Sequence, residues 1–157
     1  MDYLIAIDAD MMVIQSVGPE ILGDLVGTLH PGFLDKPRHH FSYERRPNST
    51  AFLSVVNGTN YFAGGLFGGK RKEFLDLCSN TIECIKQDLA NNQTIAKWND
   101  ESHLNHYFAL VKPPTLILSP AYCKPQSSLF LFAFFCLFIE PYAPFQIKKC
   151  PNILQKS

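Results

Sequence analysis

Two aspartates near the start of the chain could share a metal ion. Asp8 and Asp10 follow the short apolar run of residues 3–7 and are separated by a single alanine. Residues i and i+2 of a strand face the same way, so a strand edge here would present both carboxylates together. Carboxylate oxygens suit Mg²⁺, Ca²⁺ or Mn²⁺, and such a cation can neutralise a diphosphate leaving group. The alternative is that both are solvated loop carboxylates.

A second group of polar residues begins at Trp98, where the sequence reads Trp-Asn-Asp-Glu-Ser-His-Leu-Asn. A carboxylate in this segment could stand beside the anomeric carbon of a sugar, because glycosyl chemistry passes through oxocarbenium-like states that a carboxylate stabilises. Trp98 would then be an apolar platform for the sugar. The alternative is structural: Asp100 would cap a helix and Glu101 would interact with the helix dipole.

Two further candidates have equally plain structural explanations. His30 precedes Pro31 and Gly32, and a histidine in such a place is often a cap or a surface residue. The segment Tyr-Glu-Arg-Arg at residues 43–46 could be an exposed ion-pair cluster, which would contribute little to stability.

The elements that must position these residues can be read from the apolar pattern of the first half. Residues 3–7 read as a buried strand, and residues 21–29 read as a helix that opens at Gly18 and stops at Pro31. Residues 35–50 read as a loop. Residues 51–56 and 61–67 read as strands joined by an Asn57-Gly58 turn. Glycines crowd the end of the second of these strands and would permit close approach by a ligand or another segment: Gly64, Gly65, Gly68 and Gly69.

The second half predicts two helices and a strand. Residues 72–89 have helical apolar spacing, Asp100 would cap a helix that carries Leu104, Phe108 and Val111, and residues 115–118 read as a strand. Residues 129–139 form an almost unbroken apolar run, which is shorter than the roughly 20 residues that a membrane span needs.

Composition narrows the class of protein. The chain has 157 residues and is 46% apolar, enough for one domain with a real core. Its 14 basic residues balance 14 acidic ones, so the basic surface that nucleic-acid binding needs is not evident, and we expect no nucleic-acid partner. None of the five cysteines forms a Cys-x-x-Cys pair. Three glycosylation sequons, at Asn48, Asn57 and Asn92, favour a secretory compartment, although no targeting segment precedes residue 8.

Together these segments resemble glycosyltransferase family 6, the animal family of the blood-group A and B transferases, the alpha-1,3-galactosyltransferase and the Forssman synthase. Their order and spacing agree over residues 2 to about 122. The stretches that carry the resemblance are residues 2–11, 18–22, 29–33, 43–47, 67–69, 98–105, 112–113 and 118–120.

The resemblance implies an α/β chain: part of a GT-A fold, with a mixed sheet and flanking helices. It implies a retaining hexosyltransferase that moves galactose or N-acetylgalactosamine from a UDP-sugar to the 3-hydroxyl of a galactose or N-acetylgalactosamine that ends a glycan or glycolipid. It also implies a type II Golgi membrane enzyme that acts on the luminal side. Anchoring would require an N-terminal segment that this chain lacks.

Site roles carried over from the resemblance are specific. Asp8 and Asp10 match the aspartates that bind manganese and UDP, and Glu101 matches the catalytic carboxylate, either a nucleophile or a front-face ion-pair stabiliser. Asp100 matches a donor-sugar contact, as do the residues around the position of donor choice, Ala63, Gly64 and Gly65. Both Ala63 and Gly65 are small, which slightly favours N-acetylgalactosamine. Three residues match acceptor contacts: His30, Ser42 and Trp98.

The chain also departs from the family pattern. The family's first half, which holds the uracil, is absent. Where the family reads Ser-Pro-Glu-Tyr, this chain has Ser119-Pro120-Ala121-Tyr122 and then Cys123-Lys124. We therefore expect residues 1–122 to be the C-terminal portion of a GT-A catalytic domain, and 123–157 to be a divergent tail whose structure the sequence does not predict. On this basis residues 1–157 alone should have no measurable transferase activity. The alternative is a catalytically dead luminal fragment that binds metal or glycan.

Overall fold

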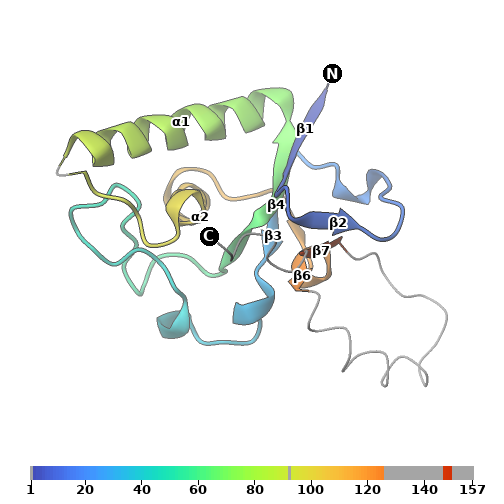
Figure 1. The fold of residues 1–157 in the computed structure, drawn as a ribbon, viewed down its shortest axis with the longest axis horizontal. Coiled ribbons are helices and arrows are strands. Elements are labelled where there is room, and N and C mark those ends of the chain that lie inside the picture. Colours follow the sequence, from blue (N-terminus) through green and yellow to red (C-terminus); the bar gives the residue numbers. More distant parts are fainter. Residues whose placement is uncertain (1, 92, 126–146, 150–157) are drawn as a thin grey trace, which may run out of the picture.

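The computed structural model of this protein describes residues 2–91, 93–125 and 147–149. Its main feature is a mixed four-stranded sheet in the order β1-β4-β3-β5 (Figure 1). Strand β4 pairs antiparallel with both β1 and β3, whereas β3 pairs parallel with β5. The strands are β1 (Tyr3–Ile7), β3 (Leu25–Leu29), β4 (Phe62–Lys70) and β5 (Leu116–Leu118).

Helices cover one face of this sheet, so the expected α/β class with a mixed sheet and flanking helices is confirmed. Helix α1 (Arg71–Ala90) follows β4 directly, and α2 (Asn99–His106) lies beside α1, packs on β4 and continues as a π-helical turn, Tyr107–Val111 (Figure 1). The core on this face joins the sheet to both helices, through Leu25, Phe62, Leu77, Leu104, Tyr107 and Phe108.

The opposite face of the sheet has its own core. A short 3-10 helix, Pro120–Cys123, packs there through Tyr122 and Cys123 against Val26, Ala63 and Leu66. Three further 3-10 helices lie in the connections: Pro19–Ile21, Pro31–Phe33 and Arg38–His40.

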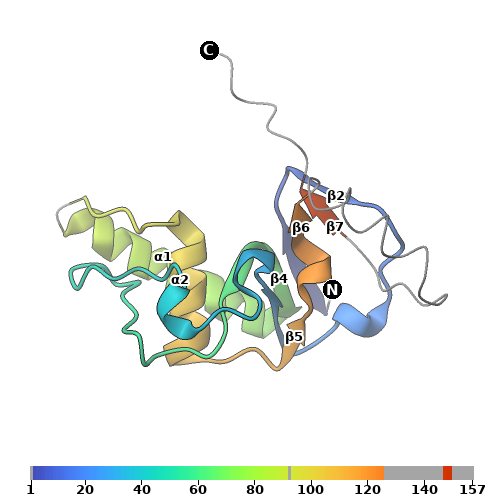
Figure 2. The ribbon, with the colours of Figure 1, turned by 90° about the horizontal axis from the view of Figure 1, so that it is seen from below.

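A second, smaller sheet has the order β2-β7-β6, at the end of the molecule away from α2 (Figure 2). It consists of β2 (Met11–Val13), β7 (Ile147–Lys149) and β6 (Lys124–Pro125). Parts of the predicted tail thus pair with the strand that follows Asp8 and Asp10. The apolar run at 129–139 lies outside the described residues. Within the described residues, no helix is both long enough and apolar enough to cross a membrane.

The glycines of β4 behave largely as the sequence predicts. A Cβ atom on Gly68 would lie 2.5 Å from the carbonyl oxygen of Leu4, and one on Gly69 would lie 2.3 Å from that of Asp24. Neighbouring backbone therefore approaches the strand at positions where no side chain would fit.

Two predicted elements were wrong. Residues 21–29 form no helix beyond one 3-10 turn, because residues 25–29 are the central strand β3, buried between β4 and β5. A strand buried on both faces is continuously apolar, and such a run also fits a helical stripe. Residues 51–56 form no strand: Ala51 and Leu53 are buried in a loop, while Val55 and Val56 are exposed.

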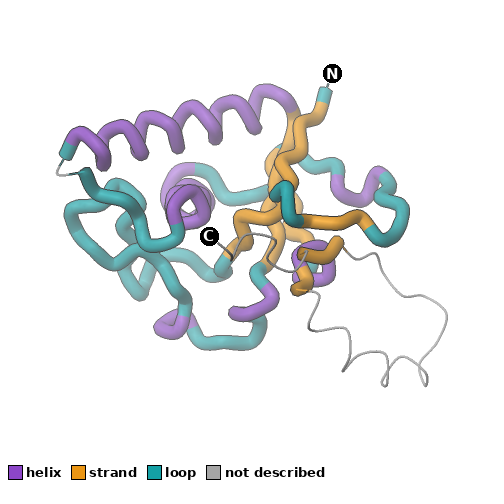
Figure 3. Tube along the Cα trace, viewed as in Figure 1, coloured by secondary structure: helices purple, strands orange, loops and turns teal. Residues whose placement is uncertain are grey.

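The helix predicted at residues 72–89 is confirmed as α1, but fewer of its apolar residues are buried than the apolar spacing predicts. Leu77 is buried, but Ile82 and Leu89 are about half exposed, at 50% and 49%. The connection between β3 and β4, residues 30–61, is mostly loop (Figure 3). This loop carries several of the predicted site residues, so the sheet and α2 must fix its position.

Candidate active site

The carboxylate of Glu101 lies where α2 meets strand β4. Its Oε1 accepts a hydrogen bond of 2.8 Å from the Tyr61 hydroxyl, and its Oε2 accepts one of 2.9 Å from the backbone N–H of Gly64. Glu101 is in the first turn of α2, where the positive end of the helix dipole favours a negative charge. The carboxylate is thus held at both oxygens by groups outside its own helix.

The start of α2 is built differently from the prediction. The N-cap is Trp98, and Asp100 lies inside the first turn without capping it. The backbone N–H of Trp98 instead donates to the Ser102 hydroxyl at 3.0 Å. Asn99 has a positive φ of 45°, a conformation that asparagine tolerates better than most residues. This turn separates Trp98, in the loop, from Glu101, on the helix.

A buried asparagine fixes α2 against the sheet. Asn105 accepts a 2.8 Å hydrogen bond from the N–H of Phe62 and donates one of 2.8 Å to the carbonyl of the same residue. It also donates to the Glu101 carbonyl at 2.9 Å. The distance between Glu101 and β4 is therefore set by a polar contact that burial makes costly to break.

Tyr61 stands in the centre of an aromatic cluster. Its side chain is 3% exposed and packs with Phe33, Phe41 and Tyr43. Burial, and after it the neighbouring Glu101 carboxylate, raise the pKa of Tyr61 well above its usual range. The hydroxyl therefore stays protonated and serves as a donor to Glu101.

His30 connects to the same cluster. Its ring meets Tyr61 edge-on, with centroids 5.6 Å apart, and its backbone N–H donates to the Tyr61 carbonyl at 2.9 Å. Its Nδ1 accepts the N–H of Gly32 at 2.9 Å, which caps the 3-10 helix Pro31–Phe33. His30 is therefore a helix cap, as the structural alternative expected. Its ring also contacts Tyr61, the residue whose hydroxyl binds Glu101.

Ser42 and Trp98, both predicted as acceptor contacts, touch each other. The indole N–H of Trp98 donates to Ser42 Oγ at 2.9 Å, and Lys97 Nζ donates to the same oxygen at 2.7 Å. Trp98 remains 50% exposed, so much of its surface is available to a ligand. The hydroxyl of Ser42 thus links the loop after β3 to the start of α2.

Asp8 and Asp10 lie in the turn between β1 and β2 rather than on a strand, so strand alternation does not set their directions. The Asp8 N–H donates to the Gly65 carbonyl at 3.1 Å. A Cβ atom on Gly65 would lie 3.6 Å from Asp8 Oδ2. Two adjacent residues of β4 thus contact the two halves of the predicted site: Gly64 binds Glu101, and Gly65 binds the turn that carries Asp8.

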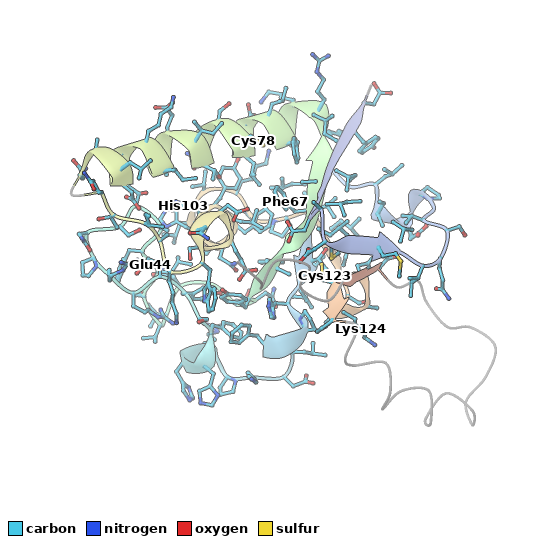
Figure 4. All side chains as sticks on the ribbon, viewed as in Figure 1. Glu44, Phe67, Cys78, His103, Cys123 and Lys124 are labelled. Atoms are coloured by element: carbon cyan, nitrogen blue, oxygen red, sulfur yellow. The ribbon has the colours of Figure 1, made fainter. Side chains whose placement is uncertain are left out.

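The other donor-site candidates divide between surface and core. Asp100 is exposed at the start of α2, whereas Ala63 is buried in the core on the other face of the sheet. Gly65 leaves a space bordered by Met11 Sδ and Cys123 Sγ, each about as close as an ordinary contact, at 3.4 and 3.5 Å. Figure 4 shows Cys123 on the side of the small sheet, away from Glu44 and His103.

The predicted exposed ion-pair cluster at residues 43–46 is in fact centred on a buried carboxylate. Glu44 is 2% exposed and accepts bonds from the N–H and guanidinium of Arg46 and from the N–H of Lys97. Chiefly because of the Arg46 hydrogen bond, the pKa of Glu44 is lowered to about 2. This carboxylate joins the loop to the segment just before Trp98, so the alternative of a fully exposed ion-pair cluster does not hold for Glu44.

His103, in the same motif as Glu101, has a structural position. It is 5% exposed, and its Nε2 lies 3.9 Å from Oδ2 of the buried Asp88. Asp88 in turn accepts bonds from the Ser49 hydroxyl and the Thr50 N–H, both at 2.7 Å. Burial lowers the pKa of His103. The pair supports the loop behind α2.

Comparison with known proteins decides the family. Residues 1–129 match the family profile described as Glycosyltransferase family 6. The chain belongs to glycosyltransferase family 6. It is 46% identical to the rat Histo-blood group ABO system transferase 1 over 128 aligned residues. This alignment covers 82% of this chain and 36% of the rat protein.

Other members of family 6 match a similar stretch. The human Globoside alpha-1,3-N-acetylgalactosaminyltransferase 1 is 42% identical over 129 residues, covering 80% of this chain and 37% of that protein. The dog protein of the same name is 43% identical over 129 residues, with the same coverage. The chain therefore spans little more than a third of the length of these relatives. The resemblance to family 6 is confirmed, while the boundary at residue 122 and the individual site roles stay predictions.

The structure brings three predicted site residues, Glu101, His30 and Asp8, into contact with Tyr61, Gly64 or Gly65, and it joins Ser42 to Trp98 separately. Sequence reasoning missed Tyr61 and Lys97, both of which contact predicted site residues. It included Asn105 in the motif that begins at Trp98 but gave it no role of its own, although Asn105 falls four residues after Glu101 and hence on the same helical face. Tyr61 gave no signal, because one tyrosine in an apolar strand reads as core.

Proposed function

We propose that this chain forms the catalytic part of a retaining hexosyltransferase with a GT-A fold. The reaction would move galactose or N-acetylgalactosamine from a UDP-sugar to the 3-hydroxyl of a galactose- or N-acetylgalactosamine-terminated glycan or glycolipid. The observation that carries the proposal is the double anchoring of Glu101 by Tyr61 and Gly64. A carboxylate that only served its own helix dipole would not need one partner on β4 and another in the loop just before that strand.

In this reaction the bond between the anomeric carbon and the diphosphate oxygen breaks, and UDP leaves with the bonding electron pair. The acceptor oxygen forms the new bond to the anomeric carbon, and its proton passes to the departing diphosphate. Glu101 would stabilise the positive charge at the anomeric carbon, either by covalent attack or as an ion pair. Asp100, Ala63, Gly64 and Gly65 would contact the donor. His30, Ser42 and Trp98 would contact the acceptor, which agrees with the direct contact between Ser42 and Trp98.

Mn²⁺ is the cofactor that this activity requires in our proposal, held by Asp8 and Asp10. Their oxygen donors suit a hard divalent cation, and their turn adjoins Gly65. Within residues 2–91, 93–125 and 147–149, no group of three or more His, Cys, Asp or Glu side chains could hold a metal. Phosphate oxygens and water would therefore have to supply the remaining ligands. When bound, the cation would neutralise charge on the diphosphate.

The donor and the cellular place are finer parts of the proposal. The small residues Ala63 and Gly65 favour N-acetylgalactosamine, and two of the relatives carry N-acetylgalactosaminyltransferase in their names. The luminal side of the Golgi membrane would be the site of action, in keeping with the three glycosylation sequons.

The test is product analysis with the full-length protein that carries this chain. Incubation with Mn²⁺, methyl β-galactoside and either UDP-galactose or UDP-N-acetylgalactosamine should give an α-linked product at the 3-hydroxyl, identified by NMR. Binding of metal or glycan without any product would instead support a catalytically inactive binding protein.

A further inference from the structure

A pocket of about 570 Å³ lies beside the predicted acceptor contacts. One wall comes from the loop at residues 43–46, and the other from residues 95–97 and Asn99. Its cationic lining residues are Arg45, Arg46 and Lys97, and we call it the Arg45–Lys97 pocket. Residues 42 and 98, which touch each other, each directly adjoin one wall in the sequence.

The pocket has an excess of positive charge. Among the described residues that line it, Glu44 is the one acidic residue, against three cations. Glu44 is already engaged with the Arg46 side chain and with the backbone N–H groups of Arg46 and Lys97. Its bonds fix Arg46 in place, and Arg46 still keeps a side-chain exposure of 51%.

Two other acidic residues belong to a neighbouring pocket, although the charge of one of them, Asp88, also helps to raise the pKa of Arg46 after its hydrogen bond to Glu44. Asp88 lines the neighbouring pocket and is bound by Ser49 and Thr50, and Asp100 also lines that neighbouring pocket. Arg45 donates to the Leu53 carbonyl and stacks over Tyr43, so it is held within the wall of the Arg45–Lys97 pocket. Arg46 and Lys97 are the exposed cations that a ligand could meet.

Lys97 connects this charge to the acceptor site. Its Nζ donates to Ser42 Oγ at 2.7 Å and lies 5.9 Å from the centre of the Trp98 ring. A sugar resting on the exposed indole would therefore have an ammonium group at its edge. An ammonium group in this place would attract a negatively charged substituent on the acceptor.

We propose that the Arg45–Lys97 pocket binds an anionic substituent, a sulfate ester or a carboxylate, on the acceptor glycan. This inference rests on the proposed function, because it assumes that Ser42 and Trp98 contact the acceptor. The preferred acceptor is then an acidic galactoside whose 3-hydroxyl is unsubstituted. Because Arg46 is already oriented by Glu44, little side-chain ordering opposes binding.

Binding measured by calorimetry with the full-length protein tests this inference without requiring turnover. The probes are methyl β-galactoside, its 6-sulfate, methyl β-galacturonide, and inorganic sulfate as the ion-only control. We expect one or both acidic galactosides to bind about fivefold more tightly than the neutral one, since exposed ion pairs are weak. The preference should fall as salt is raised from about 0.05 to about 0.5 M. Comparison of the 6-sulfate with the galacturonide shows which anion is preferred.

Variants locate the effect. Lys97→Gln should bring the affinity of the acidic galactoside down to that of the neutral one, and Lys97→Arg should keep the preference. Lys86→Gln is the matched control, because Lys86 is an exposed lysine on α1 paired with Glu83 and outside the pocket. It should behave as wild type.

Three outcomes would overturn the inference: equal binding of acidic and neutral galactosides by the wild type, inorganic sulfate binding as tightly as the galactoside sulfate, or an unchanged preference in Lys97→Gln. Competition by UDP for the galactoside sulfate would also overturn it, since the pocket would then serve the donor. Transfer to neutral methyl β-galactoside tests the proposed function separately, so the two failures are distinguishable.

Discussion

The hydroxyl of Tyr61 donates a 2.8 Å hydrogen bond to Oε1 of Glu101, across forty positions of sequence. The tyrosine ring is fixed by the aromatic cluster around it, and the glutamate is fixed by α2 and by Gly64. Two rigid elements thus define where the carboxylate stands. In the proposed reaction, Tyr61 is a positioning residue: it acts on the sugar only through Glu101.

Replacing Tyr61 by phenylalanine tests this positioning role. The ring packing is kept and one bond to a charged group is lost, so we expect kcat to fall by about 10- to 100-fold. The KM for the donor and the thermal stability should change little. Steady-state kinetics and thermal unfolding give both readouts, and Tyr3→Phe on β1 is a matched control. A wild-type kcat in Tyr61→Phe would remove Tyr61 from the mechanism.

Metal dependence tests the aspartate turn. In the full-length protein, Asp8→Asn combined with Asp10→Asn should abolish Mn²⁺-dependent UDP binding, and removing the metal with a chelator should do the same to the wild type. Titration calorimetry with and without Mn²⁺ measures it. As a control, Asp24→Asn removes an exposed carboxylate paired with Lys70. Unchanged UDP affinity in the double variant would contradict the assigned role.

Glu44 should make folding stability depend on acid pH. Its pKa in the folded protein is about 2, against an ordinary value of 4.5. A carboxyl with a lowered pKa stabilises the fold fully above its unfolded pKa, and this contribution is lost as pH falls from about 4.5 to about 2. Because its partner Arg46 is half exposed, we expect about 2 kcal/mol rather than the full shift.

Urea unfolding at several pH values checks this prediction. Glu44→Gln should be less stable than wild type at neutral pH and should lose less stability on acidification. Glu83→Gln alters an exposed pair with Lys86 and should follow the wild-type profile. If Glu44→Gln showed the same loss between pH 4.5 and pH 2 as wild type, the acid sensitivity would belong to other carboxylates.

The apolar pattern of the sequence predicted those helices and strands whose residues fit the spacing of only one kind of element. Strand β1 has the predicted bounds, and β4, α1 and β5 lie where expected to within a few residues. The central strand β3 was mistaken for a helix because its environment, with a strand on each side, comes from residues far away in the sequence. Residues 51–56 were mistaken for a strand because Ala51 and Leu53 are buried by loop packing rather than by strand pairing.

The site shows the same division. Motif resemblance pointed to Glu101, Ser42 and Trp98, whose site roles stay predictions, and the structure shows their contacts with Gly64 and with each other. It did not point to Tyr61, and the exposed ion-pair cluster considered for residues 43–46 does not describe the buried Glu44, because burial and partners arise only after folding. For Asp8 and Asp10, a strand geometry was assumed where the chain makes a turn.

The most direct measurement of the central claim is the turnover of Glu101→Gln in the full-length protein, with UDP binding determined alongside. Glutamine keeps the size of the side chain and can still accept from Tyr61 or Gly64, but it lacks the negative charge that the transition state needs. We predict that UDP affinity is retained while transfer falls by several orders of magnitude, on the order of 10³-fold or more. Turnover comparable to wild type would contradict the account and would leave Glu101 with a purely structural role at the start of α2.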